Sequence, residues 1–439
     1  MNGLQHRLSF VLLGLCSCAT TRIVVERENG WAADARMIAN SLAWSDAVFL
    51  GEVHDSDRGH ELQLAIVEEF AAKGRPVVIS MEMFERDVQG KVDAYLAGLI
   101  AEEEFLKSSR PWPNYAAHYR SIVELAKAKG MRLVAANVPR TLAAKVGREG
   151  VAAAAADPNA ASTSTAPKDA YWHEFQRAIA GDDPGAAAAI GEAALYRMYV
   201  AQCLKDDTMA ESIAKILATR SVGGMRPLVV HLCGSFHSDR GYGTVARLKA
   251  RLPDAKVGVV SMIVRDNPRA PLSYDERTRG DFVVVVSDGD KEERKAKQTK
   301  QDSPKHPPMP GSNPHQVATK NPHAVPASKP HELTSQPSKP STAVAGEDTG
   351  ERPGLGLMPD YESGGLGMAV ASVREDGPAA AAGMLAGDTV IRLAGEEVTD
   401  ARSYMVALGK LRVGQTIAIE VLRDGKSKQL EAKVGVSRR

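Results

Sequence analysis

The sequence predicts an α/β domain with a largely parallel sheet and helices on both faces, followed by a disordered linker and a small β-rich domain. Three observations lead to this prediction. Between residues 33 and 287, continuous apolar runs of strand length alternate with segments of helical periodicity. Residues 288–352 are rich in Lys, Pro, Ser, Gln and Thr, a composition that cannot bury a core. Between residues 353 and 435, short strands and glycine-containing turns return.

The overall composition limits the function only broadly. A length of 439 residues favours two or three domains, and a hydrophobic content of 44% is enough for ordinary cores. The formal net charge is +1, so no global electrostatic footprint favours nucleic acid as a partner. The function therefore has to come from local sites.

Residues 1–18 are typical of a lipoprotein signal peptide. Arg7 precedes the apolar run Leu8–Leu15, which is too short to span a bilayer. A leucine and a serine at the third and first positions before Cys18 match the pattern of a bacterial lipobox. We expect a mature chain that begins at a lipid-modified Cys18. Ala19 favours an outer-membrane anchor facing the periplasm or the surface, and a plain cleaved signal peptide is the alternative.

Each element of the first domain follows from its local pattern. Apolar runs predict strands at residues 47–53, 76–83, 132–136, 227–233, 256–263 and 282–286. Apolar residues at helical spacing predict helices at residues 58–73, 87–99, 115–129 and 244–252, and another from residue 139. A helical stretch over residues 170–220 is interrupted near residues 182–185. Residues 151–167, rich in Ala, Ser and Thr, are expected to form a mobile surface insertion.

Two cysteines remain after residue 18, Cys203 and Cys233. An oxidising periplasm would allow them to form a disulfide. Both lie in apolar surroundings, where a free buried thiol is common. The sequence leaves both states open.

The C-terminal region closely resembles a bacterial PDZ domain. Strands are predicted at residues 370–373, 389–393, 416–423 and 428–434, with a helix at residues 400–411. The resemblance is carried by the spacing of Gly377-Pro378-Ala379 and Leu385-Ala386-Gly387-Asp388. It implies that a peptide or protein C-terminus adds as a strand beside Gly354, Leu355, Gly356 and Leu357, with backbone amides holding its carboxylate.

The first domain contains two Gly-x-x-His motifs, each directly after an apolar run. They are Gly51-Glu52-Val53-His54 and Gly234-Ser235-Phe236-His237. A glycine at a strand end allows a sharp turn, and the carboxyl edge of a parallel sheet is where such folds place their ligands. The shared pattern predicts that His54 and His237 converge on one pocket.

Two carboxylates are candidates to share that pocket. Glu82 ends an apolar strand, where burial without a partner would be costly, and Glu52 lies inside the first motif. Two histidines with one or two carboxylates can bind a divalent cation or activate water. The structural alternative is that the histidines are hydrogen-bonded core residues and that the Ser and Asp residues after each motif cap helices.

Four segments of the first domain resemble the ChaN family of iron-regulated, haem-binding lipoproteins. They are Leu50-Gly51-Glu52-Val53-His54, Met81-Glu82-Met83-Phe84-Glu85-Arg86, Ala135-Ala136-Asn137-Val138-Pro139-Arg140 and Cys233-Gly234-Ser235-Phe236-His237. The resemblance covers roughly residues 40–265. ChaN is similar to the wider Tiki, TraB and erythromycin-esterase superfamily, whose members share the paired motifs and an acidic residue. The insertion, the linker and the PDZ region are departures from a minimal ChaN chain.

This resemblance implies a haem-binding protein for iron uptake. Family members hold haem at a dimer interface through an axial tyrosine, which ligates ferric haem when deprotonated. A homodimer is therefore possible, and the ligand candidates in this chain are Tyr115, Tyr119, Tyr171, Tyr196 and Tyr199. Each of them can instead be a helix-packing residue. His54, Glu52, Glu82 and His237 are further cofactor-binding candidates, and the absence of a Cys-x-x-Cys-His motif excludes covalent c-type haem.

The alternative is a metal-dependent hydrolase like the Tiki members, to which the PDZ domain delivers peptide substrates. His54, Glu82 and His237 would then bind Mn, Co or Zn, or activate water. The sequence has no H-E-x-x-H helix and no G-x-S-x-G elbow, so common zinc-protease and serine-hydrolase routes lack support. A third possibility is an assembly scaffold in which the PDZ domain carries the function. Whether the chain is an enzyme stays open.

Overall fold

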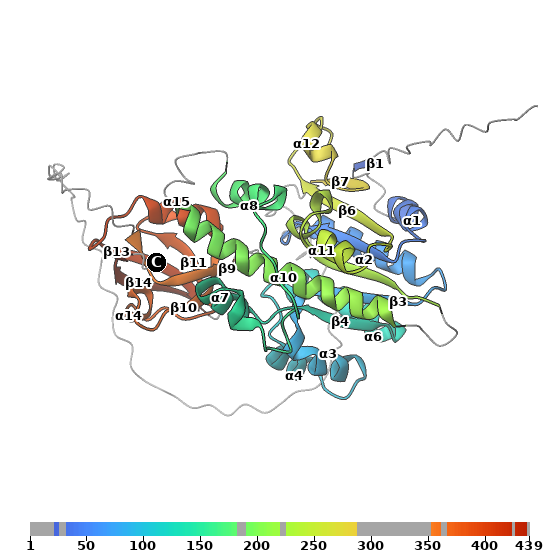
Figure 1. The fold of residues 1–439 in the computed structure, drawn as a ribbon, viewed down its shortest axis with the longest axis horizontal. Coiled ribbons are helices and arrows are strands. Elements are labelled where there is room, and N and C mark those ends of the chain that lie inside the picture. The colour runs from blue at the N-terminus through green and yellow to red at the C-terminus, as the bar shows by residue number, and fades with distance from the viewer. Residues whose placement is uncertain are drawn as a thin grey trace, which may run out of the picture. The chain divides into compact units, whose positions relative to one another are not determined.

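The computed structural model describes residues 22–25, 32–181, 190–219, 225–287, 353–360, 367–423 and 426–436. The described residues form an α/β domain up to residue 287 and a β-rich domain from residue 353 (Figure 1). The predicted signal peptide, with Cys18, and the predicted linker lie outside the described residues. Within the described residues, no helix combines the length and the apolar character that a membrane span requires.

The α/β domain is built on one sheet with the strand order β1-β7-β6-β2-β5-β3-β4, and every neighbouring pair is parallel. This confirms the predicted fold class. The strands are β1 (Arg22–Val25), β2 (Ala47–Glu52), β3 (Val77–Glu85), β4 (Arg132–Asn137), β5 (Leu228–Gly234), β6 (Val257–Val264) and β7 (Phe282–Val286). The apolar runs are continuous because the strands are buried on both faces.

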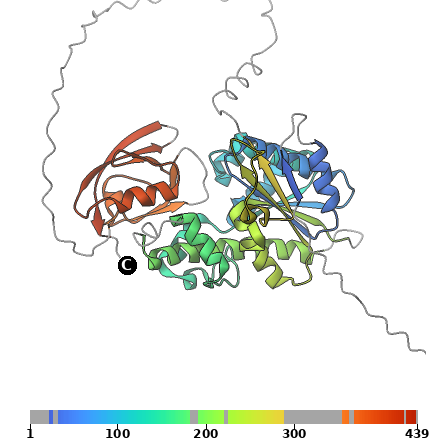
Figure 2. The same cartoon turned by 90° about the horizontal axis from the view of Figure 1, so that it is seen from above.

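Helices cover both faces of this sheet (Figures 1 and 2). One core cluster joins β2 and β3 to α1 (Ala32–Ser41), α2 (Asp57–Ala71), α3 (Gln89–Leu96), α4 (Glu102–Ser109), α5 (Tyr115–His118) and α6 (Arg120–Lys129). A second cluster joins the opposite face to α10 (Glu192–Ala218) and α11 (Gly243–Arg251). The remaining helices of this domain are α7 (Arg140–Glu149), α8 (Ala170–Ala180) and α12 (Tyr274–Arg277).

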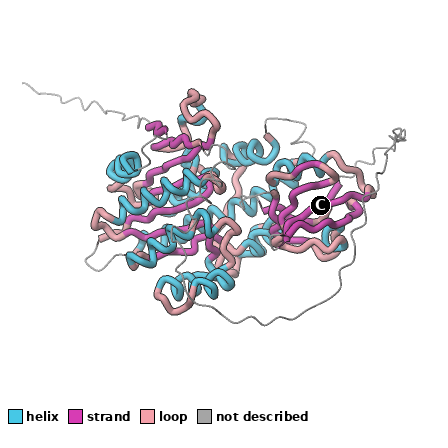
Figure 3. The backbone as a smooth tube through the Cα atoms, turned by 180° about the vertical axis from the view of Figure 1, so that it is seen from behind, coloured by secondary structure: helices cyan, strands magenta, loops and turns pink. Residues whose placement is uncertain are grey.

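The strand register brings three strand ends together at the carboxyl edge. β5 lies between β2 and β3, although it comes after both in the sequence. Glu52 of β2 is level with Gly234 of β5. On the other side of β5, Met81 of β3 is level with Leu232, so Glu82 follows one residue further along. Residues from three distant segments therefore meet at one edge of the sheet, whose strands Figure 3 draws in magenta.

Two segments of the first domain differ from expectation. The sheet begins before residue 33, because β1 pairs in parallel with β7 at the edge of the sheet. Residues 151–167 are held against α10: the backbone N–H groups of Ser162 and Thr165 donate to Glu211 and Asp207. The composition of that segment indicated a mobile surface insertion. Instead, carboxylates on α10 accept hydrogen bonds from its backbone N–H groups and hold the segment in place.

The β-rich domain is an antiparallel sheet in the order β14-β13-β11-β10-β9, and β8 pairs with β15. Its strands are β8 (Pro353–Gly354), β9 (Leu357–Asp360), β10 (Met368–Val373), β11 (Thr389–Leu393), β12 (Glu396–Glu397), β13 (Thr416–Arg423), β14 (Lys426–Lys433) and β15 (Gly435–Val436). The helices are α14 (Pro378–Ala381) and α15 (Ala401–Gly409). Asp400 caps α15 by accepting a hydrogen bond from the backbone N–H of Ser403.

Candidate functional site

Glu52, the last residue of β2, is buried and anchors the first histidine motif. Its Oε1 accepts a hydrogen bond from the Tyr119 hydroxyl at 2.6 Å and lies 2.9 Å from His54 Nδ1. Its Oε2 accepts from Gln63 Nε2 at 2.6 Å, and His60 Nδ1 is 3.7 Å away. Each carboxylate oxygen thus has at least one close polar partner, which is what burial of a charge requires.

These partners keep Glu52 ionised. Burial alone would raise the pKa of Glu52, but the nearby imidazoles of His60 and His54 and the Tyr119 hydroxyl together hold it below its ordinary value. An ionised carboxylate can only accept hydrogen bonds, so His54 presents a protonated Nδ1 to it. In the neutral imidazole, this tautomer leaves the lone pair on Nε2, the atom that points away from Glu52.

The ring of His54 lies against the end of β5. A Cβ atom built on Gly234 would come within 2.9 Å of both Cε1 and Nε2 of His54. Trp112 packs edge-on against the other side of the ring, with centroids 4.9 Å apart. The His54 side chain keeps 17% of its surface exposed, more than any other member of this cluster. His54 is therefore the member that solvent reaches.

Glu82 and the second histidine motif occupy the other side of Gly234. The Gly234 N–H donates to Glu82 Oε2 at 2.7 Å, and His237 Nε2 lies 3.4 Å from Glu82 Oε1. His237 Nδ1 is 2.7 Å from Asp206 Oδ1 on α10. The Thr244 hydroxyl donates to the same oxygen of Asp206 at 2.8 Å. Glu82, Asp206 and His237 are all buried.

The structure thus brings His54, Glu82 and His237 together around Gly234. Each histidine is held by its own buried carboxylate, Glu52 for His54 and Asp206 for His237. This is the arrangement that orients an imidazole for proton transfer. Among the described residues, no group of three or more His, Cys, Asp and Glu side chains has the geometry to hold a metal ion.

Asp206 is a residue of this cluster that sequence reasoning missed. It lies in the middle of α10 and belongs to no motif. The only signal was indirect: Asp206 and Asp207 interrupt the apolar pattern of a helix that is largely buried. Asp207 instead forms an ion pair with Arg251, 2.8 Å between Oδ1 and Nη1.

The five tyrosine candidates form two groups: Tyr115 and Tyr119 belong to the core cluster of β2 and β3, and Tyr171, Tyr196 and Tyr199 belong to a second cluster on α8 and α10. Tyr119 and Tyr171 reach the histidine network indirectly, because their hydroxyls donate to Glu52 and to Asp206. Burial raises the pKa values of Tyr115, Tyr119, Tyr171 and Tyr199, which favours the protonated phenol at neutral pH. Tyr196 is the only one of the five that is partly exposed, and its hydroxyl donates to the Ala166 carbonyl.

Cys203 and Cys233 are both free and buried. Burial raises the pKa of the Cys203 thiol to about 12 and also raises that of Cys233. Neither thiol is therefore activated as a nucleophile.

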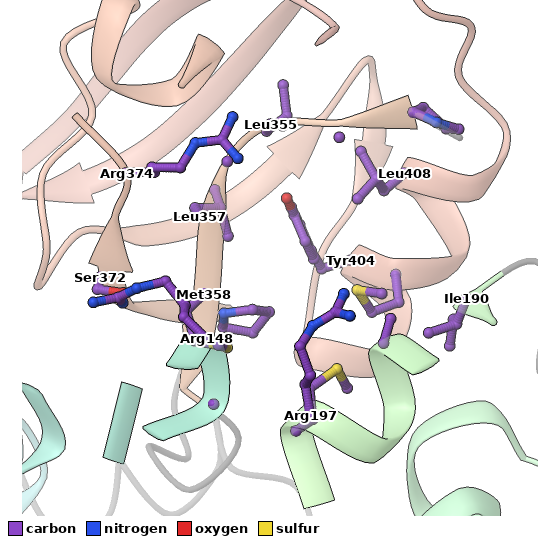
Figure 4. A pocket seen from close by; sticks show the side chains of 18 of the residues that line it. Arg148, Ile190, Arg197, Leu355, Leu357, Met358, Ser372, Arg374, Tyr404 and Leu408 are labelled. Carbon is purple, nitrogen blue, oxygen red and sulfur yellow. The ribbon is translucent and has the colours of Figure 1, made fainter. Parts of the chain in front are cut away.

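In the β-rich domain, the predicted peptide-binding loop borders a pocket. Leu355 and Leu357 line it from the loop and the start of β9, and Tyr404 and Leu408 line it from α15 (Figure 4). Gly356 has a φ of +72°, a conformation that glycine adopts without strain. A strand edge beside an apolar helix face is the geometry used for peptide addition.

Known proteins match the two domains separately. The family model described as "Haem-binding uptake, Tiki superfamily, ChaN" matches residues 38–248. The PDZ domain model matches residues 348–434. The two family models thus cover the α/β and β-rich domains in turn.

Curated relatives match only a short segment. Over 69 residues, or 16% of this chain, it is 38% identical to a probable periplasmic serine endoprotease DegP-like of Pseudomonas fluorescens and 35% identical to one of Pseudomonas putida. The match spans 14% of the length of either relative.

Among solved structures, the chain is similar to "Cofacial heme binding to ChaN of Campylobacter jejuni", with 16% identity and a TM-score of 0.44, over 56% of this chain and 89% of that one. It is also similar to "HtrA-type protease AlgW with decapeptide", with 37% identity and a TM-score of 0.19, over 20% of this chain and 30% of that one.

Proposed function

We propose that this chain binds haem at the bacterial cell envelope for iron uptake, and that its PDZ domain binds a peptide or protein C-terminus. The proposal starts from two assignments: residues 38–248 are a ChaN-type domain of the Tiki superfamily, and residues 348–434 are a PDZ domain. The observation that carries the proposal is the match of a haem-binding family model to residues 38–248, which include the whole His54–Glu82–His237 cluster and all five tyrosine candidates.

Haem binding is tested by titrating hemin into the full chain and recording the absorption spectrum. We expect a saturable shift of the Soret band. Tyr196→Phe is the first variant, because an iron ligand has to reach a porphyrin that arrives from solvent. The matched control is Tyr95→Phe, which alters a buried tyrosine outside the candidate set. If the unmodified chain shows no saturable shift, haem binding is refuted. If the shift survives substitution of all five tyrosine candidates, the iron ligand is another residue.

Envelope anchoring rests on the lipobox at Cys18. Two acyl signals hold a protein on a membrane far more firmly than one. Mass spectrometry of the mature N-terminus is expected to show an acylated Cys18, and Cys18→Ser is expected to release the protein from the membrane fraction. An unmodified N-terminus in membrane-free extracts would contradict the anchor.

Peptide binding by the PDZ domain is tested with one C-terminal peptide in two forms, the free acid and the amide. In the proposed binding mode, backbone N–H groups of the loop at Gly354–Leu357 hold the peptide carboxylate, so amidation is expected to weaken binding about tenfold or more. Equal binding of the two forms would reject the carboxylate groove.

A second candidate function is hydrolysis, because both histidines are held by buried carboxylates beside Glu82. Ester and peptide substrates are incubated with the full chain, with and without a chelator. Turnover that is lost on chelation supports a divalent metal ion, and turnover that survives chelation supports general-base catalysis. Turnover that is unchanged in both His54→Gln and His237→Gln would exclude this cluster as its source.

A further inference from the structure

The strands of the α/β sheet begin at the edge opposite to the His54–Glu82–His237 cluster. We call this the amino edge. It is formed by the segments that lead into β2, β3, β4, β5 and β6, which are residues 42–46, 72–76, 129–132, 225–227 and 253–256. Because neighbouring strands are parallel, these segments lie on one side of the sheet and the cluster lies on the other.

Trp44 is the most conspicuous residue of the amino edge. It lies in the turn between α1 and β2, which the Ser45 N–H closes by donating to the Leu42 carbonyl at 3.0 Å. Trp44 is 85% exposed, whereas Trp112 and Trp172 are buried. An indole left in water forgoes the burial that usually stabilises a tryptophan. The interface between a membrane and water is an environment in which tryptophan is enriched.

Arg75 holds the turn that carries Trp44. Its Nη1 donates to the backbone carbonyls on either side of Trp44, at 3.0 and 2.6 Å. Its Nε and Nη2 donate to the carbonyls of Arg226 and Pro227, both at 3.1 Å. One guanidinium thus joins the segment before β2 to the segment before β5. Met225, which is 53% exposed, precedes Arg226 and adds a second apolar side chain to this part of the amino edge.

The amino edge is basic. Among the exposed residues of its five described segments, only Asp254 is acidic and five are lysine or arginine. The basic residues are Lys73, Lys129, Arg132, Arg226 and Lys256. Anionic phospholipid headgroups attract basic side chains that lie near the membrane surface. An exposed tryptophan within a basic surface therefore fits an anionic lipid surface better than it fits water.

The proposed lipid anchor reaches the same edge of the sheet. β1 is the edge strand (Figure 1), and its first residue, Arg22, is level with Leu50 of β2 through the registers of β7 and β6. β2 begins at Ala47, three residues before Leu50, a distance of about 10 Å. Cys18 precedes Arg22 by four residues, which span at most about 14 Å. A lipid on Cys18 therefore enters a bilayer at about the level at which β2 begins, and the tether is too short to hold the domain at a distance.

We infer that the amino edge lies against the surface of an anionic phospholipid bilayer, with Trp44 among the headgroups and the basic residues of the edge facing lipid phosphates. This inference rests on the proposed lipid anchor at Cys18 and adds an orientation to it. β2 rises by about 17 Å from its first residue to its last, at the carboxyl edge of the sheet. The histidine cluster at the carboxyl edge therefore lies on the side away from the bilayer and receives its ligand from the aqueous phase.

The first experiment measures quenching of tryptophan fluorescence by phospholipids that are brominated near the headgroup end of their acyl chains. The full acylated chain is reconstituted in vesicles of phosphatidylglycerol and phosphatidylethanolamine. Every variant carries Trp31→Phe, because Trp31 lies close to Cys18 in the sequence. Trp44→Phe is expected to remove most of the quenching. The matched control, Trp172→Phe, alters a buried tryptophan of α8 and is expected to leave the quenching unchanged.

The second experiment separates the surface from the anchor. The mature chain from residue 19 lacks the acyl group, and its binding to vesicles is measured by sedimentation. We expect binding to phosphatidylglycerol that falls with added salt, and weaker binding to phosphatidylcholine. Lys73→Glu combined with Arg226→Glu is expected to weaken binding to phosphatidylglycerol about tenfold or more. The control combines Lys107→Glu with Arg269→Glu, two exposed residues outside the amino edge, and is expected to stay within about twofold of the unmodified chain.

The two experiments distinguish failure of the orientation from failure of the anchor. If Cys18 is acylated but Trp44→Phe is quenched as strongly as the unmodified chain, the orientation is overturned and the anchor stands. Binding of the unacylated chain that ignores the charge of the vesicles and of the amino edge would also overturn the inference. If Cys18 is not acylated but Lys73 and Arg226 still support binding to anionic vesicles, the anchor is refuted and the amino edge stands as a lipid-binding surface.

Discussion

The close approach of His54 to Gly234 makes Gly234→Ala a direct test of the cluster. Gly234 has φ −55° and ψ 141°, values that alanine adopts without strain. The added Cβ would lie 2.9 Å from two atoms of the His54 ring, whereas carbon contacts are normally about 3.5–4.0 Å. The effect of the substitution therefore comes from the collision with His54 and not from the backbone.

The expected loss follows from what His54 has to give up. Moving the ring by roughly 0.6–1 Å to restore contact distance stretches its 2.9 Å bond to Glu52 Oε1 beyond hydrogen-bond range. Loss of a hydrogen bond to a charged group, or overpacking in its place, destabilises a protein by about 1–3 kcal/mol. We therefore expect Gly234→Ala to lower the free energy of unfolding by about 2 kcal/mol.

The assay is urea unfolding of the full chain followed by tryptophan fluorescence. All four tryptophans precede residue 288, so the signal reports on the α/β domain alone. The matched control is Gly90→Ala, an exposed position in α3 where a Cβ meets nothing within 4 Å. It is expected to stabilise by about 0.5–1 kcal/mol.

A double-mutant cycle with His54→Ala identifies the cause of the loss. Without the imidazole, Gly234→Ala is expected to change the free energy of unfolding by less than about 0.5 kcal/mol. An equal loss in both backgrounds would show that His54 does not lie against Gly234, and the description of the cluster would be wrong.

Three further predictions concern other buried groups. Asp206→Ala leaves several buried donors without their acceptor and is expected to lower the free energy of unfolding by about 3–5 kcal/mol. The control Asp254→Ala, at an exposed position, is expected to change it by less than about 0.5 kcal/mol. A loss below about 1 kcal/mol for Asp206→Ala would contradict the hydrogen-bond network around Asp206. Burial raises the pKa of Asp239 from 3.8 to about 6 on folding, so its ionisation destabilises the fold as the pH rises through that window. Asp239→Asn cannot ionise, and its loss of stability between about pH 4 and pH 7 is expected to be smaller than that of the unmodified chain by about 3 kcal/mol. An unchanged dependence of stability on pH would refute the raised pKa. Cys203 and Cys233, both buried with raised thiol pKa values, are expected to react with a maleimide only in denaturant, as measured by mass spectrometry; rapid labelling of the native chain would contradict their burial.

The sequence was most informative about the first domain where apolar runs are continuous. Each predicted strand from 47–53 to 282–286 exists in the structure, because only residues buried on both faces produce such runs. β1 was missed, since a four-residue edge strand carries too little pattern to distinguish it from a tether. The predicted helix at residues 115–129 is two helices, α5 and α6, divided at Tyr119, whose side chain turns inward to Glu52.

The candidate site shows the limit of pattern reasoning. Strand-end motifs indicated that His54 and His237 would lie at one sheet edge, because parallel strands end together. No local pattern marks Asp206, which acquires its role only through the packing of α10 against the motif that follows β5. Arg75 likewise joins residues 43–45 to residues 226–227 only in the folded chain. The chemical roles of all these residues stay predictions.

The place of β5 has a consequence for how the domain is made. β2 and β3 emerge early during synthesis, yet they cannot pair with each other, because the strand that separates them follows more than 140 residues later. Until it arrives, two apolar strands present open hydrogen-bonding edges, the feature that promotes aggregation of nascent chains. Pairing across such distances is slow. A chain truncated before Leu228 would therefore lack not only His237 but also β5, the strand that joins β2 to β3. We expect such a chain to depend on chaperones to stay in solution.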